Sequence, residues 1–199
     1  MLVARRNRSG SKLPLIIGIA VVVLIAFLAI GQYNNLVNLE EDVDNKWAQV
    51  DNQIKRRADL IPNLVNTVKG VAGQEQKVYG DIAKAQASLA QAATTEQTIQ
   101  ADQQVTTSLR GLIALQMTYP ELKSNQQFQA LMDSLEGTEN RLGIARKDYN
   151  DVVTTYNKKR RSFPTSLYAS VFGFEKKPYY EISESDRENP TVDFESDSQ

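Results

Sequence analysis

Apolar residues recur every three or four positions through most of this chain, and this spacing constrains the fold more than any other feature. Between residues 36 and 71 the apolar positions step by 4 and 3 in alternation, and the same alternation returns between residues 128 and 156. A repeat that averages about 3.5 residues is typical of helices packed as a left-handed coiled coil. Only Glu40 and Arg57 interrupt the first series, and only Thr138 interrupts the second. The sequence therefore predicts an all-α protein.

Four amphipathic helices are predicted, over residues 33–72, 74–92, 97–118 and 121–161. Thr94 or Thr95 can cap the third helix, and Pro120 can end that helix and begin the fourth. Because the outer two helices are about twice as long as the inner two, we predict an antiparallel, coiled-coil-like four-helix bundle of two long and two short helices over residues 32–162, with a two-helix stalk at one end. A three-helix core with one loosely attached helix is the alternative.

A continuous apolar segment, from Leu13 to Ile30, precedes the bundle and contains no charged residue. As a helix it would span about 27 Å, close to the roughly 30 Å hydrocarbon core of a bilayer. A cleaved signal peptide is the alternative, but the segment exceeds a typical signal-peptide core and no A-x-A cleavage site follows it. We predict an N-terminal transmembrane anchor over residues 13–31.

The flanking charges predict the orientation of this anchor. Residues 1–12 carry four cations and no acid, whereas the first charges after the anchor are acidic, from Glu40 to Asp44. The positive-inside rule therefore places the basic segment 1–12 in the cytoplasm and the helical body outside it. We expect a single-pass protein of the plasma membrane, which is the inner membrane if the cell is bacterial.

Composition excludes several classes of site. The chain has no cysteine and no histidine, which removes disulfides, thiolate nucleophiles and the commonest general base and metal ligand. A net charge of −1 argues against a nucleic-acid-binding surface. The sequence also lacks a Gly-rich phosphate loop or a metal-spaced motif. We therefore predict a protein that is not an enzyme and has no catalytic residues, metal site or cofactor.

The polar interruptions of the repeat are predicted to meet in one layer. If the long helices pair antiparallel so that facing residue numbers sum to about 194, Arg57 lies beside Thr138 and between Glu136 and Glu139. A buried cation needs such partners because its desolvation is costly. We predict that Arg57 pairs with Glu136 or Glu139, bonds Thr138 and fixes the register of the helices.

A binding or catalytic cluster is the alternative interpretation of the same stretch. Arg56, Arg57 and Asp59 could bind an anion, and Pro62 is predicted to bend the helix near Ala58. This alternative makes Arg56, Asp59 and Pro62 the candidate residues of a binding site at the bend.

The remaining residues, 163–199, are predicted to be extended, first aromatic and then acidic. The aromatic part is rich in Phe and Tyr but too short to span a bilayer. Its side chains either cover the apolar flank of the stalk, which we favour, or lie at the lipid interface.

Several motifs resemble the LemA family. The stretch YNNLVNLEEDVDNKWAQVDNQIKRRADLIPNLVNTVKG, followed at characteristic distances by EGTENR, ARKDYN and SFP, is similar to the family pattern. The run KGVAGQEQ lacks the histidine that the family has before Glu75, so no role of that histidine can be carried over. The resemblance implies a single-pass membrane protein with an antiparallel helical body and no established activity. It also implies partners, namely a membrane protease or a TPM-type protein.

The sequence therefore predicts a non-catalytic scaffold or adaptor that binds other cell-envelope proteins. An extracytoplasmic ligand- or peptide-binding module with a site near Pro62 is the alternative.

Overall fold

The computed structural model describes residues 13–181, except for the side chains of residues 13–15, 21, 22, 25, 26 and 28. The regular elements in this range are all helices, which confirms the predicted all-α class. The chain forms two compact units. Unit 1 holds the residues up to Glu41 together with Thr155–Lys176, and unit 2 holds Asp42–Thr154 together with the residues from Lys177 onward. The basic segment 1–12 and the acidic tail after residue 181 lie outside the described residues.

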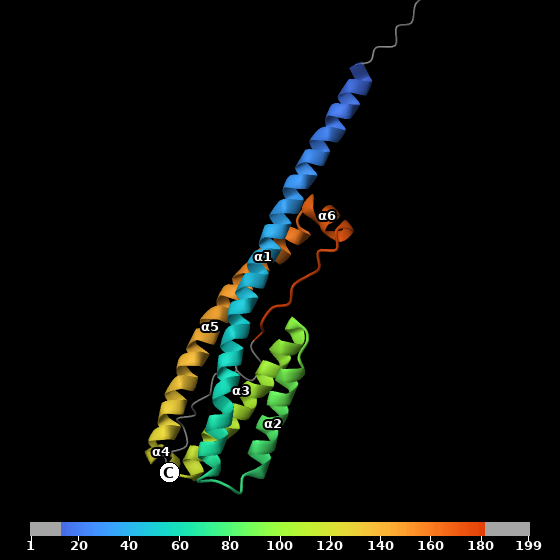
Figure 1. Ribbon diagram of the computed structural model, residues 1–199. Coiled ribbons are helices and arrows are strands. Elements are labelled where there is room, and N and C mark those ends of the chain that lie inside the picture. The colour runs from blue at the N-terminus through green and yellow to red at the C-terminus, as the bar shows by residue number, and fades with distance from the viewer. Residues whose placement is uncertain (1–12, 182–199) are drawn as a thin grey trace, which may run out of the picture. The chain divides into compact units, whose positions relative to one another are not determined.

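The first helix, α1 (Leu13–Lys69), is one continuous element that includes both the apolar segment and the first predicted bundle helix (Figure 1). It ends three residues earlier than predicted, where Gly70 begins a turn. Of the ten positions of the 4-3 repeat that lie in α1, Arg57 and seven apolar residues are buried: Leu36, Val43, Val50, Ile54, Ile61, Leu64 and Val68. The periodicity therefore identified the buried face of α1 correctly.

The N-terminal part of α1 exposes large apolar side chains between residues 16 and 30. They are Ile16, Ile17, Ile19, Val23, Leu24, Phe27 and Ile30. In the part of the chain that the structure describes, no helix is found with the length and apolar character needed to cross a bilayer.

The two short helices, α2 (Gln76–Gln91) and α3 (Thr95–Thr118), pack side by side (Figure 1). Thr94 caps α3, because its hydroxyl accepts from the backbone N–H of Gln97 while the Gln97 side chain accepts from the backbone N–H of Thr94. This reciprocal capping box confirms one of the two predicted caps. Tyr119, before Pro120, is the C-cap of α3, as predicted.

The predicted fourth helix is two helices, α4 (Glu121–Ser124) and α5 (Gln126–Arg161), so a single helix over residues 121–161 was wrong. Asn125 has extended backbone between them, and its side-chain oxygen accepts from the N–H of Phe128. An asparagine that bonds a backbone N–H three residues later competes with continuation of the helix.

The tail after Phe163 is not wholly extended as predicted, because it contains the short helix α6 (Thr165–Val171). Pro164 precedes α6 with φ near the value that a helix requires. Thr165 and Ala169, one turn apart, are buried and hold this helix within unit 1. This segment is too short to show a helical repeat of apolar residues. It forms a helix because packing within unit 1 buries one of its faces.

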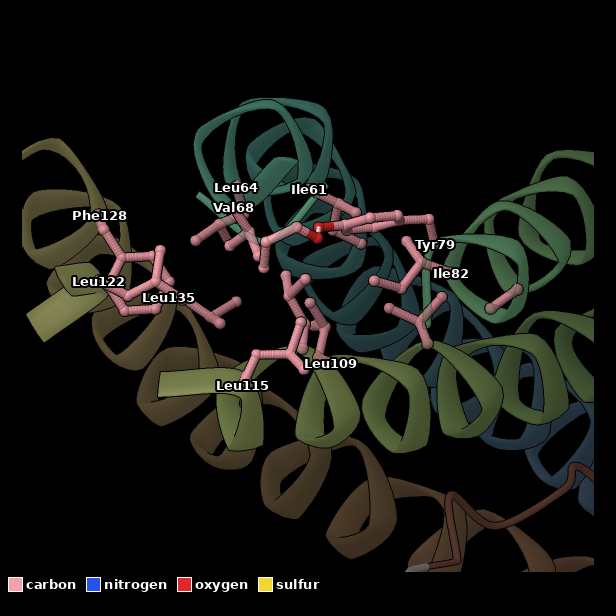
Figure 2. Packing of buried hydrophobic residues seen from close by; sticks show 14 residues of the cluster. Ile61, Leu64, Val68, Tyr79, Ile82, Leu109, Leu115, Leu122, Phe128 and Leu135 are labelled. Carbon is pink, nitrogen blue, oxygen red and sulfur yellow. Dashed lines mark hydrogen bonds between the residues drawn. The ribbon is translucent and has the colours of Figure 1, made fainter. Parts of the chain in front are cut away.

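The core of unit 2 is built by residues from α1, α2, α3, α4 and α5. Figure 2 shows Leu64 of α1, Ile82 of α2 and Leu109 of α3 pointing toward one another. Because α2 contributes to this shared core, the alternative with one loosely attached helix is wrong. Lys46 pairs with Asp148 at 2.9 Å and, further along α1, Arg57 pairs with Glu139 at 2.6 Å, so α1 and α5 run antiparallel near the predicted register.

Unit 1 joins the N-terminal part of α1 to the end of α5 and to α6. The ring of Tyr33 contacts those of Phe172 and Phe174 edge-on, with centroids 5.1 and 5.6 Å apart. The Tyr156 hydroxyl donates to the carbonyl of Glu175 at 2.9 Å. Aromatic residues of the tail therefore pack against the part of α1 that belongs to the same unit.

Candidate functional site

An ionic layer with a buried centre lies inside unit 2 and joins three helices to the segment from residue 177 onward. Arg57 comes from α1, Asp102 from α3, and Glu139 and Arg146 from α5. Tyr180 belongs to residues 177–181, which we call the strap. Arg57 and Asp102 expose only 1% and 0% of their surface. We call these five residues the ionic layer.

Arg57 occupies a core position of the α1 repeat and reaches across to both other helices. Its Nη1 donates to Glu139 Oε2 at 2.6 Å and to Thr106 Oγ1 at 3.0 Å. Its Nη2 donates to the carboxylate and, at 3.2 Å, to the carbonyl of Asp102. Charge-assisted bonds of this kind offset part of the cost of burying the guanidinium.

Arg146 and Tyr180 complete the coordination of the Asp102 carboxylate. Arg146 donates from Nη2 to Asp102 Oδ2 at 2.9 Å and from Nη1 to Glu139 Oε1 at 3.1 Å. The Tyr180 hydroxyl also donates to Asp102 Oδ2, and the Arg146 guanidinium lies 4.5 Å from the centre of the Tyr180 ring. Each carboxylate therefore binds both guanidinium groups.

Burial and neighbouring charges both act on the pKa values of Tyr180 and Arg146. Burial raises the pKa of the Tyr180 phenol, and the neighbouring Asp102 raises it further, so the hydroxyl stays protonated and donates. Burial alone would lower the pKa of Arg146, but Tyr180, Asp102 and Glu139 raise it above its ordinary value. The ionic layer thus holds two cations, two carboxylates and a neutral phenol, and its charges cancel.

The strap is held mainly through its backbone. The Asn150 side chain accepts from the N–H of Tyr180 and donates to the Tyr180 carbonyl, both at 2.9 Å. The Tyr149 hydroxyl donates to the carbonyl of Pro178 at 2.9 Å. Tyr149 is buried, as the repeat predicts, and Asn150 supplies flanking hydrogen bonds. Burial also raises the pKa of the Tyr149 phenol.

The structure brings together only part of the predicted polar layer. Glu139 contacts Arg57, but the Thr138 hydroxyl donates to the carbonyl of Ser134 at 2.8 Å instead. Glu136 is exposed and lines a small groove of about 380 Å³ that Arg57 also borders. That the layer fixes helix register stays a prediction.

The residues of the alternative site are exposed on unit 2. Asp59 and Pro62 line an open groove of about 910 Å³ between α1 and residues of α2 and α3, such as Leu89 and Thr98. Arg56 is exposed as well but is not among the residues that line this groove. The helix is continuous through Pro62, and the bend there stays a prediction.

Comparison with known proteins settles the family. The model of the LemA family matches residues 46–194, which include every member of the ionic layer and the strap. The chain belongs to the LemA family. Magnetosome protein MamQ 2 of Paramagnetospirillum magneticum strain AMB-1 is 25% identical over 191 residues, covering 82% of this chain and 70% of the relative.

Two further relatives have similar coverage. Magnetosome protein MamQ of Magnetospirillum gryphiswaldense strain MSR-1 is 24% identical over 203 residues, covering 88% of this chain and 75% of the relative. Protein LemA of Metamycoplasma hominis is 20% identical over 163 residues, covering 81% of this chain and 74% of the relative.

Sequence reasoning missed three members of the ionic layer in this LemA-family chain. Asp102 could have been found, because stepping the α3 series back by three residues from Val105 places it at a core position. Arg146 only flanks the core position Ala145, and residues that flank a core position are usually solvated. Tyr180 lies outside every repeat, so no periodic signal points to it.

Proposed function

We propose that this LemA-family chain is a non-catalytic, membrane-anchored scaffold that binds other proteins of the cell envelope. The observation that carries the non-catalytic part is the internal neutralisation of the ionic layer. Its two guanidinium groups are bonded to its two carboxylates, and Tyr180 donates to Asp102. Charges that are bonded to one another in this way are not directed at a substrate, and they serve to join α1, α3, α5 and the strap.

Membrane anchoring is supported by the seven exposed apolar side chains between residues 16 and 30 of α1. Such a surface is unfavourable in water and favourable in hydrocarbon. The proposal rests on the whole apolar segment from Leu13 to Ile30, several side chains of which lie outside the described set. The cations of residues 1–12 support an orientation with the N-terminus in the cytoplasm and the helical body outside it.

Charged substitutions within the apolar segment test the anchor. The double variant Val23→Arg, Leu24→Arg should shift the protein from the membrane to the soluble fraction, because each arginine near the middle of a span costs about 2.5–3.5 kcal/mol. The matched control Asn34→Arg, Asn35→Arg places the same charges on exposed positions of α1 outside the segment and should stay in the membrane. Membrane retention of the first variant would refute the anchor.

Protease accessibility tests the orientation. Protease added to intact cells, or to cells with a permeabilised outer membrane, should digest the helical body. Digestion only after the inner membrane is opened would refute the orientation.

Crosslinking in native membranes tests the scaffold role. A photo-crosslinking residue at Met117, which is 81% exposed on α3, should capture the same envelope protein in repeated mass-spectrometric experiments. The family resemblance suggests a membrane protease or a TPM-type protein as that partner. If positions across unit 2, including Met117 and Ile144, yield only unmodified chain, the scaffold proposal fails.

A ligand- or peptide-binding module is the second candidate, favoured by the groove beside Pro62. The groove presents Asp51, Lys55 and Asp59 along α1, so it offers charged groups beside an apolar wall that includes Leu89. Saturable binding of a small ligand that is lost in Asp59→Lys and kept in Arg56→Gln would favour this candidate over the scaffold.

A further inference from the structure

The short helix α6 has one buried and one exposed apolar face. Thr165 and Ala169 point into unit 1 and are almost fully buried. Leu167 and Val171, one turn apart on the helix, are 58% and 79% exposed, and Phe163 just before the helix is 82% exposed. Together with Phe172, which is 57% exposed, we call these residues the α6 patch. Apolar side chains gathered in this way mark a surface that binds something.

Contacts within unit 1 place α6 beside the end of the apolar segment of α1. The Thr165 hydroxyl donates to the Gln32 side-chain oxygen at 3.1 Å. The ring of Tyr33 contacts that of Phe172. Gln32 and Tyr33 directly follow the proposed anchor over residues 13–31. If that segment crosses a bilayer, α6 lies at the level of the lipid headgroups.

The residues around α6 are strongly basic. From residue 155 to 176 the sequence holds five cations, namely Lys158, Lys159, Arg160, Arg161 and Lys176, and one acid, Glu175. Arg160 donates from Nε to the carbonyl of Phe174 at 2.7 Å, which ties the end of α5 to the chain after α6. Apolar and aromatic side chains next to such a basic cluster match the chemistry of a membrane surface with anionic headgroups.

We propose that the α6 patch and the basic residues before it form a site for anionic phospholipids on the membrane face where α1 emerges. This inference rests on the proposed membrane anchoring. In this site Phe163, Leu167 and Val171 enter the boundary between headgroups and acyl chains, while the cations of residues 158–161 contact the phosphates. A bare apolar protein surface would not account for those four consecutive cations. Binding at this site fixes unit 1 against the bilayer.

The absence of cysteine allows a direct test, because a single introduced cysteine can be labelled in the full chain. An environment-sensitive dye is attached at Leu167→Cys, and the chain is placed in nanodiscs of phosphatidylglycerol mixed with phosphatidylcholine, or of phosphatidylcholine alone. Lipids that carry a quencher near the headgroup report contact with the bilayer. The same dye at Ile144→Cys, an apolar position of α5 that is 65% exposed, supplies the reference.

We expect quenching at residue 167 that is strong with phosphatidylglycerol and weaker without it, and little quenching at residue 144. The charge variant Lys158→Gln, Lys159→Gln, Arg161→Gln keeps the Arg160 bond to Phe174. At low ionic strength it should lower the equilibrium constant for docking about fivefold for each cation removed.

Each of the other outcomes contradicts a different part of the proposal. A chain that stays in the nanodisc while the dye at residue 167 is quenched no more than at residue 144 refutes the α6 site and leaves the anchor standing. Protection of the dye without quenching by lipid shows that protein covers the patch. Equal quenching in both lipid compositions would show that the basic cluster does not contribute to binding of anionic lipid. A chain that does not associate with nanodiscs refutes both the site and the anchor.

Discussion

Paired substitution of Arg57 and Asp102 is the sharpest test of the ionic layer. Arg57→Met leaves the buried Asp102 and the half-exposed Glu139 sharing one cation, Arg146. Asp102→Leu leaves both guanidinium groups with Glu139 alone and removes the acceptor of Tyr180. Removal of one partner of a buried ion pair costs about 3–5 kcal/mol, because it leaves an uncompensated charge.

The double variant should be much milder than either single change suggests. It keeps the Arg146–Glu139 bond of 3.1 Å and leaves the layer electrically neutral. Its main cost is the Tyr180 hydroxyl without an acceptor, about 1–3 kcal/mol. Two independent single effects would sum to about 6–10 kcal/mol, so we expect a coupling free energy of roughly 3 kcal/mol or more. In the described residues, Nε of Arg57 and of Arg146 has no hydrogen-bond partner, so an apolar replacement also removes an incompletely bonded group.

Urea titration of the full chain in detergent micelles measures these free energies. Trp47 is the only tryptophan, and its ring lies 5.3 Å from that of Tyr149 within unit 2, so its fluorescence reports the unfolding of that unit. The control pair Lys46→Met and Asp148→Leu removes a half-exposed ion pair and should show far smaller losses with little coupling. If the loss in the Arg57, Asp102 double variant equals the sum of the two single losses, the reasoning fails.

Three further changes probe the strap, a surface ion pair and a helix cap. Tyr180→Phe should lower the free energy of unfolding by about 1–3 kcal/mol, because the Asp102 carboxylate loses a donor. It should also speed chymotrypsin cleavage after Tyr179 in the strap, and an unchanged cleavage rate would contradict this. The hydrogen bond from Lys46 lowers the pKa of Asp148 below its ordinary value of 3.8. This pair therefore stabilises the fold above that pH, and the stabilisation is lost as the pH falls through the lowered pKa. In Asp148→Asn the urea concentration at the midpoint of unfolding should consequently decrease less as the solution is made acidic. Thr94→Ala should destabilise unit 2 by about 1 kcal/mol in the same titration, and no change would show that the capping box is not needed.

The helices and their buried faces could be predicted because they depend on local periodicity. Leu36, Ile61 and Leu142 are buried at positions that the 4-3 repeat marks. The ends were less predictable, because Asn125 interrupts the fourth helix through a single side-chain bond to a backbone N–H. Nothing in the repeat distinguishes such an asparagine from one on a solvated helix face.

The ionic layer was only partly predictable, for a different reason. Arg57 and Glu139 could be matched because both lie on long helices with a shared register. The Tyr180 contact depends on the path of a non-helical segment, and that path is set by side chains such as Asn150 that bond its backbone. Because these hydrogen bonds are made to backbone atoms, the side chains of the strap carry no sequence pattern that reveals its path.

The separation of Asp102 and Tyr180 along the chain imposes an order on biosynthesis. The two residues are 78 positions apart, and residues 155–176, which belong to unit 1, lie between the last helix of unit 2 and the strap. During translation, α1, α3 and α5 can therefore assemble while the buried carboxylate still lacks its phenol donor. Unit 2 is completed only after the whole of unit 1 has left the ribosome, so the newly made bundle passes through a stage in which this layer is open to water.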